Sequence, residues 1–526
     1  MNLPRSNMPG TGVRKTTLWG YLGFLGLALL FVGLRWNSYD TPLTRDEGEY
    51  AYSAWLLKQG VAPYQHAFLQ KPPMIVYTYL LAELVAPQTS WFPRVLAGLF
   101  VGLTTLLIGA IARREFGPGS GMVAMWFVTP MVLLPRVEQY TANTEMFLIL
   151  PLAGVVAVYV FARNQSQGRH WLAAGILAAL SLLYKLTVLP LLLFLGVVWS
   201  YEEWKTKRSP GALLRRWLLC AAGGLLTSGV VLAFFLKTDG AQSLWDCVVR
   251  FNYYYSQSGL FTLAVAGFRF DSFWSAWWIL FLLPLALIPK SPSRMWFWVA
   301  LTVLAFAETY GSPDGHYYIP AMLFWALLTT AAASALVSSI SMRFAAHRAW
   351  VKGAIVTILL VFICLPDASV LALTKEQFLA RMYPFRQSTA IAQRLAEITS
   401  PNDYVLVAGS EPEILYQARR RSCTRFVLVY PLMMPTPLAE RYQLEAIRDL
   451  QQRPPAAVVL ALSQKSWLVR PSTPEEFQVY LAGMLRRDYE LIGGYVAEDG
   501  GSFWRGPMSS PLVQRSTMLL FRLKSR

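Results

Sequence analysis

Charged residues are scarce in this chain. They make up 15 % of its 526 residues, whereas hydrophobic residues make up 55 %. A water-soluble protein of this length carries more charge on its surface, and the mean hydropathy of +0.38 is positive. The composition therefore excludes an ordinary soluble enzyme and predicts a polytopic membrane protein.

Cysteine and acidic residues are also few. The four cysteines have no paired spacing, and two of them lie inside apolar runs, which argues against a disulfide framework and against a cysteine metal cluster. Acidic residues number 30 against 47 basic ones, a net charge of +17. Much of this excess lies in short clusters between apolar runs, where it sets membrane orientation, so no nucleic-acid partner is expected.

The apolar runs are long enough to cross a membrane. The first, residues 16–36, is longer than the apolar core of a signal peptide, so we expect an uncleaved span that enters from the cytoplasm. With eleven spans in total, the basic clusters between them face the cytoplasm. The ten further spans are predicted near residues 93–112, 119–135, 145–162, 171–184, 186–201, 213–236, 273–289, 294–310, 317–339 and 350–366.

One apolar stretch is predicted not to cross. Residues 74–86 are few, carry Glu83 and lie between two prolines, so we expect a re-entrant or surface helix. One added crossing would also turn the basic loops outward. The run from residue 171 to 201 is interpreted as two short helices that meet at Lys185.

Beyond residue 366 the composition changes to that of a water-soluble domain. Short β-like runs alternate there with helical stretches, which is typical of a small α/β domain with a mainly parallel sheet. The expected strands are 404–409, 424–431 and 456–463, and the expected helices are 412–420 and 438–452. We therefore expect an all-α polytopic membrane domain at 1–366 and an extracytoplasmic α/β domain at 367–526, without a dinucleotide fingerprint.

Polar residues gather on the predicted outer loops. The first outer loop, residues 37–92 with juxtamembrane helices, carries Asp46, Glu47, Glu49 and Lys71. Charged groups near hydrocarbon are expensive to place, so a group of them on one face indicates a functional site, although solvated loops are also simply polar. The other members of this group are His66, Arg136, Glu138, Asn143, Glu145, Lys185, Arg250, Arg269, Asp271, Asp314 and His316.

An acid and a lysine in one outer loop suit transfer of a sugar from a lipid phosphate. Displacing a phosphate from an anomeric carbon requires its charge to be neutralised, and the acceptor hydroxyl must lose a proton. Lys71 suits the first task and Asp46 the second. Arg250 and Arg269 are further phosphate-binding candidates, because a guanidinium offers two donors.

Other residues have several candidate roles. Glu47 and Glu145 could hold Asp46 in place, raise its pKa or share a divalent cation with it, and the sequence leaves these open. His316 is a candidate for donor phosphate or metal, so the metal candidates are Asp46, Glu145 and His316. The predicted substrate-pocket residues are Glu49, Tyr50, Tyr64, Gln70 and Tyr317.

Four motifs resemble a known family: DEGEYAY from Asp46, QKPP from Gln70, NTEMF from Asn143 and GHYYIPAM from Gly315. Over roughly residues 17–366 the chain resembles the GT-C superfamily of polyprenyl-phosphate-sugar-dependent glycosyltransferases. Within it, the chain is similar to the bacterial branch related to protein O-mannosyltransferases and lipid A aminoarabinose transferases.

The resemblance implies a multi-pass enzyme of the inner (plasma) membrane with an extracytoplasmic active site. It implies a lipid-phosphate-sugar donor and inverting transfer to a lipid, glycan or protein acceptor. By motif position, Asp46 matches the catalytic acid, Lys71 the phosphate-contacting lysine and Glu145 the second acidic position. Gln70 stands where the aminoarabinose transferases carry an acid, and Glu145 where Asp is common, so the substrate and any metal stay open.

Each candidate also has a structural interpretation. Asp46 could cap the helix that follows it, and Lys71 could extend toward lipid head groups. His316 could belong to an interfacial aromatic belt, and Glu145 could interact with a helix dipole. Two other functions stay open: a transporter or flippase without transferase activity, which should place ionisable groups in mid-membrane, and a non-catalytic assembly protein.

Overall fold

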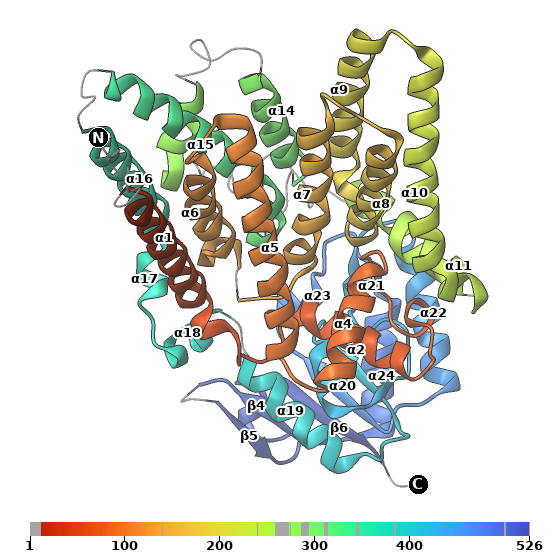
Figure 1. Cartoon of the computed structure of the whole chain (residues 1–526). Helices are drawn as coiled ribbons and strands as arrows, with labels where there is room; N and C mark the ends of the chain where they lie inside the picture. The colour runs from red at the N-terminus through yellow and green to blue at the C-terminus, as the bar shows by residue number, and fades with distance from the viewer. Residues whose placement is uncertain are drawn as a thin grey trace, which may run out of the picture.

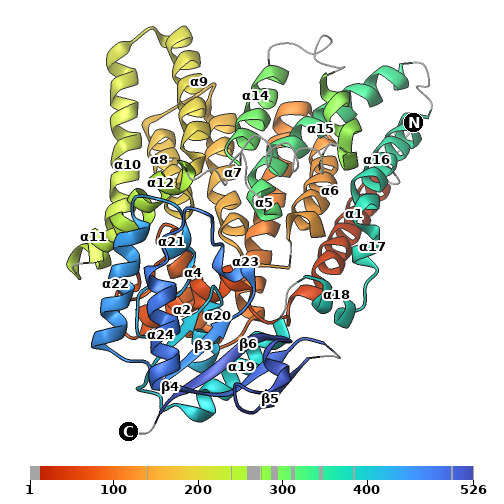
Figure 2. The same ribbon diagram turned by 180° about the vertical axis from the view of Figure 1, so that it is seen from behind.

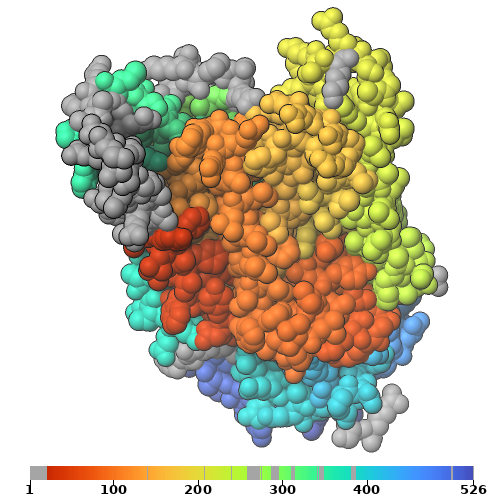
Figure 3. All heavy atoms as spheres, viewed as in Figure 1, coloured from red at the N-terminus to blue at the C-terminus, as the bar shows by residue number. Residues whose placement is uncertain are grey.

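The computed structural model describes residues 12–524 except 139, 239, 258–272, 274, 286–293, 310–313, 343–346, 383–384 and 499–500. A bundle of helices forms one part of the molecule, and a sheet with its covering helices forms the other (Figure 1). The first outer loop lies between the two parts, and Figure 3 shows its atoms filling the space there on one face.

Each of the eleven expected spans coincides with a helix. In the described part of the chain, seven segments built on α1, α5, α7, α9, α10, α15 and α16 are long and apolar enough to cross a membrane. The other four helices have 17 residues or fewer, so the protein is polytopic but the count of eleven is not confirmed. The eleven helices are α1 (Gly12–Arg35), α5 (Trp91–Phe116), α6 (Ser120–Leu133), α7 (Thr144–Ala162), α8 (Gly168–Tyr184), α9 (Leu189–Lys207), α10 (Pro210–Lys237), Ser275–Leu285, α14 (Arg294–Ala307), α15 (Ile319–Ser341) and α16 (Arg348–Cys364).

Glycines let α8 and α10 approach each other closely. Gly175 faces the backbone of Cys220, and Gly223 faces the carbonyl of Leu172, so a Cβ at either glycine would collide with the neighbouring helix. Small residues at helix contacts are typical of membrane proteins, where van der Waals packing drives association. This packing fixes α8, whose C-terminal end reaches the candidate site described below.

Short helices make up the first outer loop: α2 (Arg45–Lys58), α3 (Pro63–His66) and α4 (Met74–Val85). α2 begins after Thr44, whose N–H donates to Glu47 Oε2 at 2.9 Å in a capping box. α4 has 12 residues, about 18 Å of helix, which is short of the roughly 30 Å of a bilayer core. It packs against α2, as expected of a segment that does not cross.

The C-terminal part contains a six-stranded sheet in the order β2-β1-β3-β6-β4-β5. Its strands are β1 (Tyr404–Ala408), β2 (Arg421–Ser422), β3 (Ala457–Ala461), β4 (Tyr489–Val496), β5 (Ser502–Arg505) and β6 (Ser516–Leu523). α19 lies on one face of the sheet, and α24 lies on the other with α22 beside it (Figures 1 and 2). The helices of this part are α17 (Ala368–Leu371), α18 (Lys375–Met382), α19 (Phe385–Ile398), α20 (Pro412–Ala418), α21 (Tyr430–Met433), α22 (Ala439–Gln452), α23 (Gln464–Trp467) and α24 (Glu476–Asp488).

The sheet is mixed, so the expectation of a mainly parallel sheet is wrong. β1 pairs in parallel with β2 and with β3. β6 pairs antiparallel with β3 and β4, and β4 pairs antiparallel with β5. The last strand of the chain, β6, lies between β3 and β4 and pairs antiparallel with both. The half of the sheet formed by β6, β4 and β5 is therefore antiparallel.

Residues 424–431 do not form the expected strand. Thr424 Oγ1 accepts a hydrogen bond from the N–H of Phe426 at 3.0 Å, which turns the chain locally. The carbonyl of Arg425 accepts from the N–H of Phe68 in the first outer loop at 2.5 Å. The apolar side chains of this segment are therefore buried against the outer loop instead of within the sheet.

The first outer loop and the C-terminal part are packed tightly together. Gly48 of α2 lies so close to α20 that a Cβ there would come within 2.5 Å of the backbone nitrogen of Glu413. Arg419, just after α20, forms an ion pair with Glu83 of α4 at 2.9 Å. The C-terminal part therefore helps to hold the helix on which Asp46 stands.

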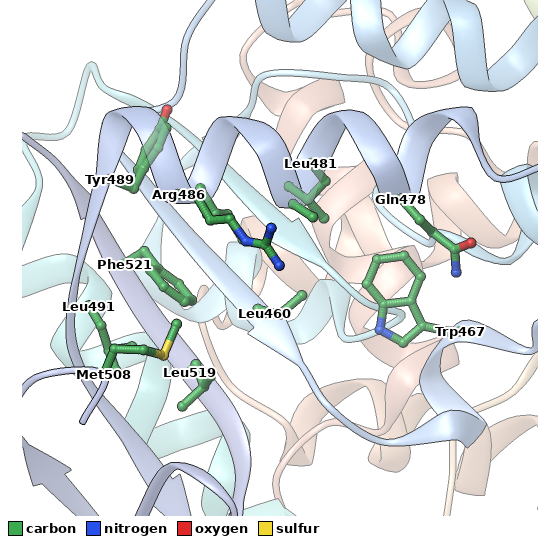
Figure 4. Close-up of a pocket in the computed structure, with 12 residues that line it drawn as sticks. Leu460, Trp467, Gln478, Leu481, Arg486, Tyr489, Leu491, Met508, Leu519 and Phe521 are labelled. Carbon is green, nitrogen blue, oxygen red and sulfur yellow. The ribbon is translucent and has the colours of Figure 1, made fainter. Parts of the chain in front are cut away.

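The C-terminal part also contains an apolar cavity of about 530 Å³ between α24 and the sheet (Figure 4). Leu481 and Leu485 of α24 line it from one side, and Leu519 and Phe521 of β6 from the other. All of its lining residues belong to the C-terminal part, so it is separate from the outer-loop residues predicted to act.

Candidate active site

A cavity of about 160 Å³ lies where the first outer loop meets the ends of membrane helices. Lys71 of the loop and Lys185 between α8 and α9 line it, together with Tyr317 before α15. Two lysines at one small cavity favour an anionic ligand. The other lining residues are Gln70, Pro72, Leu186, Thr187, Asn252, Tyr255, Ser256, Glu308 and Thr309.

Lys71 is held in this cavity through its backbone and its side chain. Tyr64 Oη donates to the Lys71 carbonyl at 2.8 Å, and Asn252 Nδ2 donates to the Gln70 carbonyl at 2.8 Å. The Lys71 ammonium donates to Tyr317 Oη at 3.3 Å and lies 4.9 Å from the centroid of that ring. The side chain is buried, so it does not extend toward lipid head groups. The predicted residues Tyr64, Gln70 and Tyr317 therefore surround Lys71.

Lys185 occupies the break between α8 and α9, as the interpretation of two short helices required. Its ammonium forms a buried ion pair with Glu145 at 2.7 Å and lies 4.0 Å from the centroid of the Tyr317 ring. Glu145 stands in the first turn of α7, where the helix dipole also favours a negative charge. The two lysines thus face one aromatic ring, and Glu145 neutralises one of them.

Asp46 lies in the first turn of α2, and 34 % of its side chain is exposed. Its Oδ2 lies 3.8 Å from Nε2 of His316, in the short turn that precedes α15. Nδ1 of His316 lies 2.7 Å from Oε2 of Glu138, whose other oxygen accepts from the N–H of Gly315 at 3.0 Å. The imidazole is therefore held between two carboxylates. Its ring also stacks on Tyr317, with 4.6 Å between the centroids, which joins it to the lysine pair.

Asp46 does not cap its helix, because Thr44 is the N-cap residue of α2. The capping interpretation of Asp46 is therefore wrong. Glu47 completes the capping box, and its buried carboxylate also pairs with Arg94 at 2.7 Å and accepts from the N–H of Ala142 at 2.8 Å. Consecutive helical residues point in different directions, so Glu47 faces Arg94 whereas Asp46 faces His316, unlike the catalytic placement of Glu47 expected from the sequence.

Glu49 and Tyr50 are buried one turn beyond Asp46. Burial and then repulsion by Asp46 raise the pKa of the Glu49 carboxyl well above its usual range, although Lys71 opposes this shift. Tyr50 Oη accepts a hydrogen bond from Thr144, the residue before Glu145, at 3.3 Å. Both predicted pocket residues therefore lie close to the site, Glu49 near Asp46 and Lys71, and Tyr50 next to the start of α7.

Other predicted residues lie elsewhere. Arg250 lines a separate groove, where its guanidinium lies 3.8 Å from Asp246, so it is not brought to Lys71. His66 is exposed at the end of α3 and is not among the residues that line the cavity. Arg269 and Asp271 fall outside the described residues.

Several lining residues had no assigned role in the sequence. Lys185 gives the clearest signal, because a lysine inside an apolar run is rarely placed without a partner. Asn252, Tyr255 and Glu308 belong to segments without a motif. Glu138 sits in a turn with a positive φ of 55°, and nothing in the sequence shows that this turn aims its carboxylate at His316.

The metal candidates do not form one coordination site. No group of three His, Cys, Asp or Glu side chains is arranged to hold a metal ion in the part of the chain that the structure describes. Asp46 and His316 face each other, but Glu145 is paired with Lys185. The three residues named from the sequence as metal candidates are therefore not brought together around one position.

Comparison with protein families and with solved structures agrees with this architecture. A family model described as dolichyl-phosphate-mannose-protein mannosyltransferase matches residues 70–225. No curated protein sequence matches the chain. ArnT from Cupriavidus metallidurans is similar in structure in its apo state, with 14 % identity and a TM-score of 0.58 over 96 % of this chain and 98 % of that chain.

The same enzyme bound to undecaprenyl phosphate matches with 15 % identity and a TM-score of 0.53, with the same coverage of both chains. The family match covers the segment that carries Lys71, Glu145 and Lys185. The resemblance expected from the four motifs is thereby confirmed. From end to end, the chain has a fold similar to that of ArnT.

Proposed function

We propose that this protein is an integral-membrane glycosyltransferase. It takes a sugar from a polyprenyl-phosphate donor and transfers it to a lipid, glycan or protein acceptor on the extracytoplasmic side of the inner (plasma) membrane. The observation that carries this proposal is the single ring of Tyr317, which contacts Lys71 and Lys185 and stacks on His316, the partner of Asp46. The related ArnT structure with undecaprenyl phosphate bound supports this class of donor.

Lys71 is suited to the phosphate of the donor. Glu145 balances the charge of Lys185, so Lys71 supplies the excess positive charge of the lysine pair. Its ammonium is held in place by a hydrogen bond to Tyr317 Oη. A charge that is preorganised in this way stabilises the negative charge that develops on the leaving phosphate without rearranging solvent.

Asp46 is suited to the acceptor. Its carboxylate is partly exposed, so an acceptor hydroxyl can reach it. The acceptor oxygen forms a bond to the anomeric carbon, the bond from that carbon to the phosphate oxygen breaks, and the hydroxyl proton passes to Asp46. The electron pair of the broken bond leaves with the phosphate beside Lys71. A single displacement of this kind inverts the anomeric configuration.

His316 is a positioning residue in this scheme. The contact between its Nδ1 and Glu138 fixes the ring and leaves Nε2 facing Asp46. A carboxylate behind an imidazole determines which ring nitrogen carries the proton. His316 therefore controls the direction in which the Asp46 carboxylate points.

The domain boundaries and the orientation belong to the same proposal. Residues 1–366 form the transmembrane domain, residues 37–92 supply Asp46 and Lys71 to the site, and residues 367–526 form the extracytoplasmic domain. α2 packs directly on α20, so the helix of Asp46 and the C-terminal domain lie on one side of the membrane. Positive-inside loops then place that side on the extracytoplasmic face of the membrane.

A transporter is not favoured by the placement of the charges. Glu145 lies in the first turn of its helix, and Lys185 lies between two helices. Both stand at helix ends rather than in the middle of a span, where transporters place ionisable groups. A non-catalytic assembly role would not explain why Asp46 faces His316.

Reconstitution of the purified protein tests the proposal. Proteoliposomes would receive polyprenyl-phosphate donors labelled in the sugar, together with cell-envelope extract as the acceptor source. We expect label to appear on an acceptor and polyprenyl phosphate to be released. Donor that crosses the bilayer with its sugar still attached would indicate a transporter and would refute the transferase. Mass spectrometry of envelope lipids and glycans, with and without the intact gene, would then identify the product.

A further inference from the structure

A second polar cavity, of about 820 Å³, lies beside the candidate active site. It is formed between the helix α11 (Gly240–Trp245) with its continuation to α12 (Phe251–Gln257) and α22 of the C-terminal part. Arg250 lines it, although the sequence had suggested this residue for the donor phosphate. We call this cavity the basic groove.

The groove carries an excess of positive charge. Its lining includes the four arginines Arg250, Arg425, Arg441 and Arg448 but only two carboxylates. Both carboxylates are engaged by Arg425, whose guanidinium lies 3.0 Å from Asp246 and 2.6 Å from Glu445. An arginine-rich groove of this kind fits an anion, because guanidinium groups bind phosphate through paired donors.

Two of the four arginines are better placed for a ligand than the others. Arg425 is buried and joins α22 to the segment between α11 and α12, so its role is to hold the groove together. Arg441 forms an ion pair with Asp246 at 2.7 Å. Arg250 lies at a looser 3.8 Å from Asp246, and Arg448 donates through Nε to a carbonyl of its own helix, so within the described residues most of their donors are not engaged.

The groove lies just beyond the end of a candidate span. The candidate span α10 ends at Lys237, and α11 begins three residues later at Gly240. Trp245 and Tyr253 line the groove with 60 % and 61 % of their surfaces exposed. Exposed tryptophan and tyrosine are typical of the head-group region of a bilayer, so the groove opens where lipid head groups lie.

One helical segment separates the groove from the active-site cavity. Trp245, Asp246, Val249, Arg250, Tyr253 and Tyr254 line the groove. Asn252, Tyr255 and Ser256 of the same segment face the cavity that contains Lys71. Val249, Arg250 and Tyr253 follow Asp246 by three, four and seven residues, and Tyr255 and Ser256 follow Asn252 by three and four. These residues therefore occupy two different faces of the segment. A ligand in the groove would therefore be separated from the active-site cavity by a single helix.

We propose that the basic groove binds the phosphate of an anionic membrane lipid, with Arg250 and Arg448 as its principal contacts. The arginine excess accounts for the anionic head group, and the exposed aromatic residues and the position beside α10 account for a lipid rather than a soluble phosphate. This site is distinct from the cavity at Lys71 and does not depend on the transferase proposal.

Native mass spectrometry of the full chain in detergent tests this site. The probes are phosphatidylglycerol, which is anionic, phosphatidylcholine, which is zwitterionic, and inorganic phosphate. We expect retention of phosphatidylglycerol over phosphatidylcholine. The double variant Arg250→Gln and Arg448→Gln should weaken phosphatidylglycerol binding by about tenfold or more, because two charge-assisted contacts are lost.

The matched control is the double variant Arg487→Gln and Arg522→Gln. It removes the same charge from two exposed arginines of the C-terminal part, outside the groove. Its lipid binding should equal that of the wild type. Equal binding of both lipids, or an equal loss in the control, would overturn the proposal. Inorganic phosphate that binds as tightly as phosphatidylglycerol would overturn the assignment to a lipid.

Discussion

Oδ2 of Asp46 lies 3.8 Å from Nε2 of His316, although one residue belongs to the first outer loop and the other to the start of α15. This contact brings two of the four sequence motifs together. The stacking of His316 on Tyr317 extends the arrangement to Lys71 and Lys185. The candidate active site is therefore assembled around Tyr317 from segments far apart in the chain.

Replacing Lys71 by alanine should reduce turnover by about a hundredfold or more, because a preorganised positive charge beside the leaving phosphate would be lost. Lys375→Ala is the matched control, since that lysine is exposed and pairs with Asp40 on the surface. Turnover by the purified variants, at matched amounts of folded protein, measures the effect. Equal turnover of the two variants would show that Lys71 does not act on the donor.

Glu47→Gln should act on stability instead of on chemistry. Its carboxylate is fully buried against Arg94, and removing one partner of a buried ion pair costs about 3–5 kcal/mol. We expect a clearly lower melting temperature in detergent. A variant that melts like the wild type but transfers no sugar would contradict this structural role and restore Glu47 as a catalytic candidate.

Gly48→Ala should displace α2, because the added Cβ would meet the backbone of Glu413. A shift of about 1 Å at a catalytic group can cost about a hundredfold in rate, so activity should fall together with melting temperature. Gly102→Ala is the control, because a Cβ on that helical glycine meets no atom within 4 Å. Full activity of Gly48→Ala would mean that packing on α20 does not position Asp46.

Glu413 should make the stability of the protein depend on pH. Burial, and next the repulsion by Glu411, raise the pKa of Glu413 from 4.5 to about 8. Between these values the unfolded chain releases a proton that the folded protein keeps, so the free energy of unfolding should decrease as pH rises from about 4.5 to about 8. Below about pH 4.5 the contribution of Glu413 to the free energy of unfolding is fully present.

Melting temperatures measured across that pH range check the effect of Glu413. Glu413→Gln should flatten the decrease, because an amide keeps the neutral form at every pH. Glu440→Gln, at an exposed position of α22, should leave the slope as it is in the wild type. An unchanged slope in Glu413→Gln would assign the pH dependence to other groups.

The helices of the membrane part were predictable because apolar runs and basic loops define them directly. The break at Lys185 was visible for the same reason, since a charged residue interrupted an apolar run. The sheet was harder to predict from the sequence. The strands β4, β5 and β6 lie after the last strand that the sequence pattern predicted. The antiparallel position of β6 depends on pairing with residues far away in the chain.

The site was predictable in its residue types but not in its pairings. Asp46 and Lys71 stood out because both are charged and lie in one outer loop. The carboxylates of Asp46 and Glu47 point to different partners. Glu47 is held by the capping box and by Arg94, which comes from another helix. The position of Arg250 depends on which face of its helix meets the C-terminal part, and the sequence alone does not show that.

The transfer rate of Asp46→Asn tests the central claim most directly. Asparagine keeps the size of the side chain but cannot take the acceptor proton, so we expect a loss of about 10² to 10⁴-fold with an unchanged melting temperature. Asp40→Asn, at an exposed aspartate of the same loop, should transfer sugar at the wild-type rate. The assay follows labelled sugar from the polyprenyl-phosphate donor to its acceptor. Transfer by Asp46→Asn at more than about a tenth of the wild-type rate would contradict the assignment of Asp46 as the base.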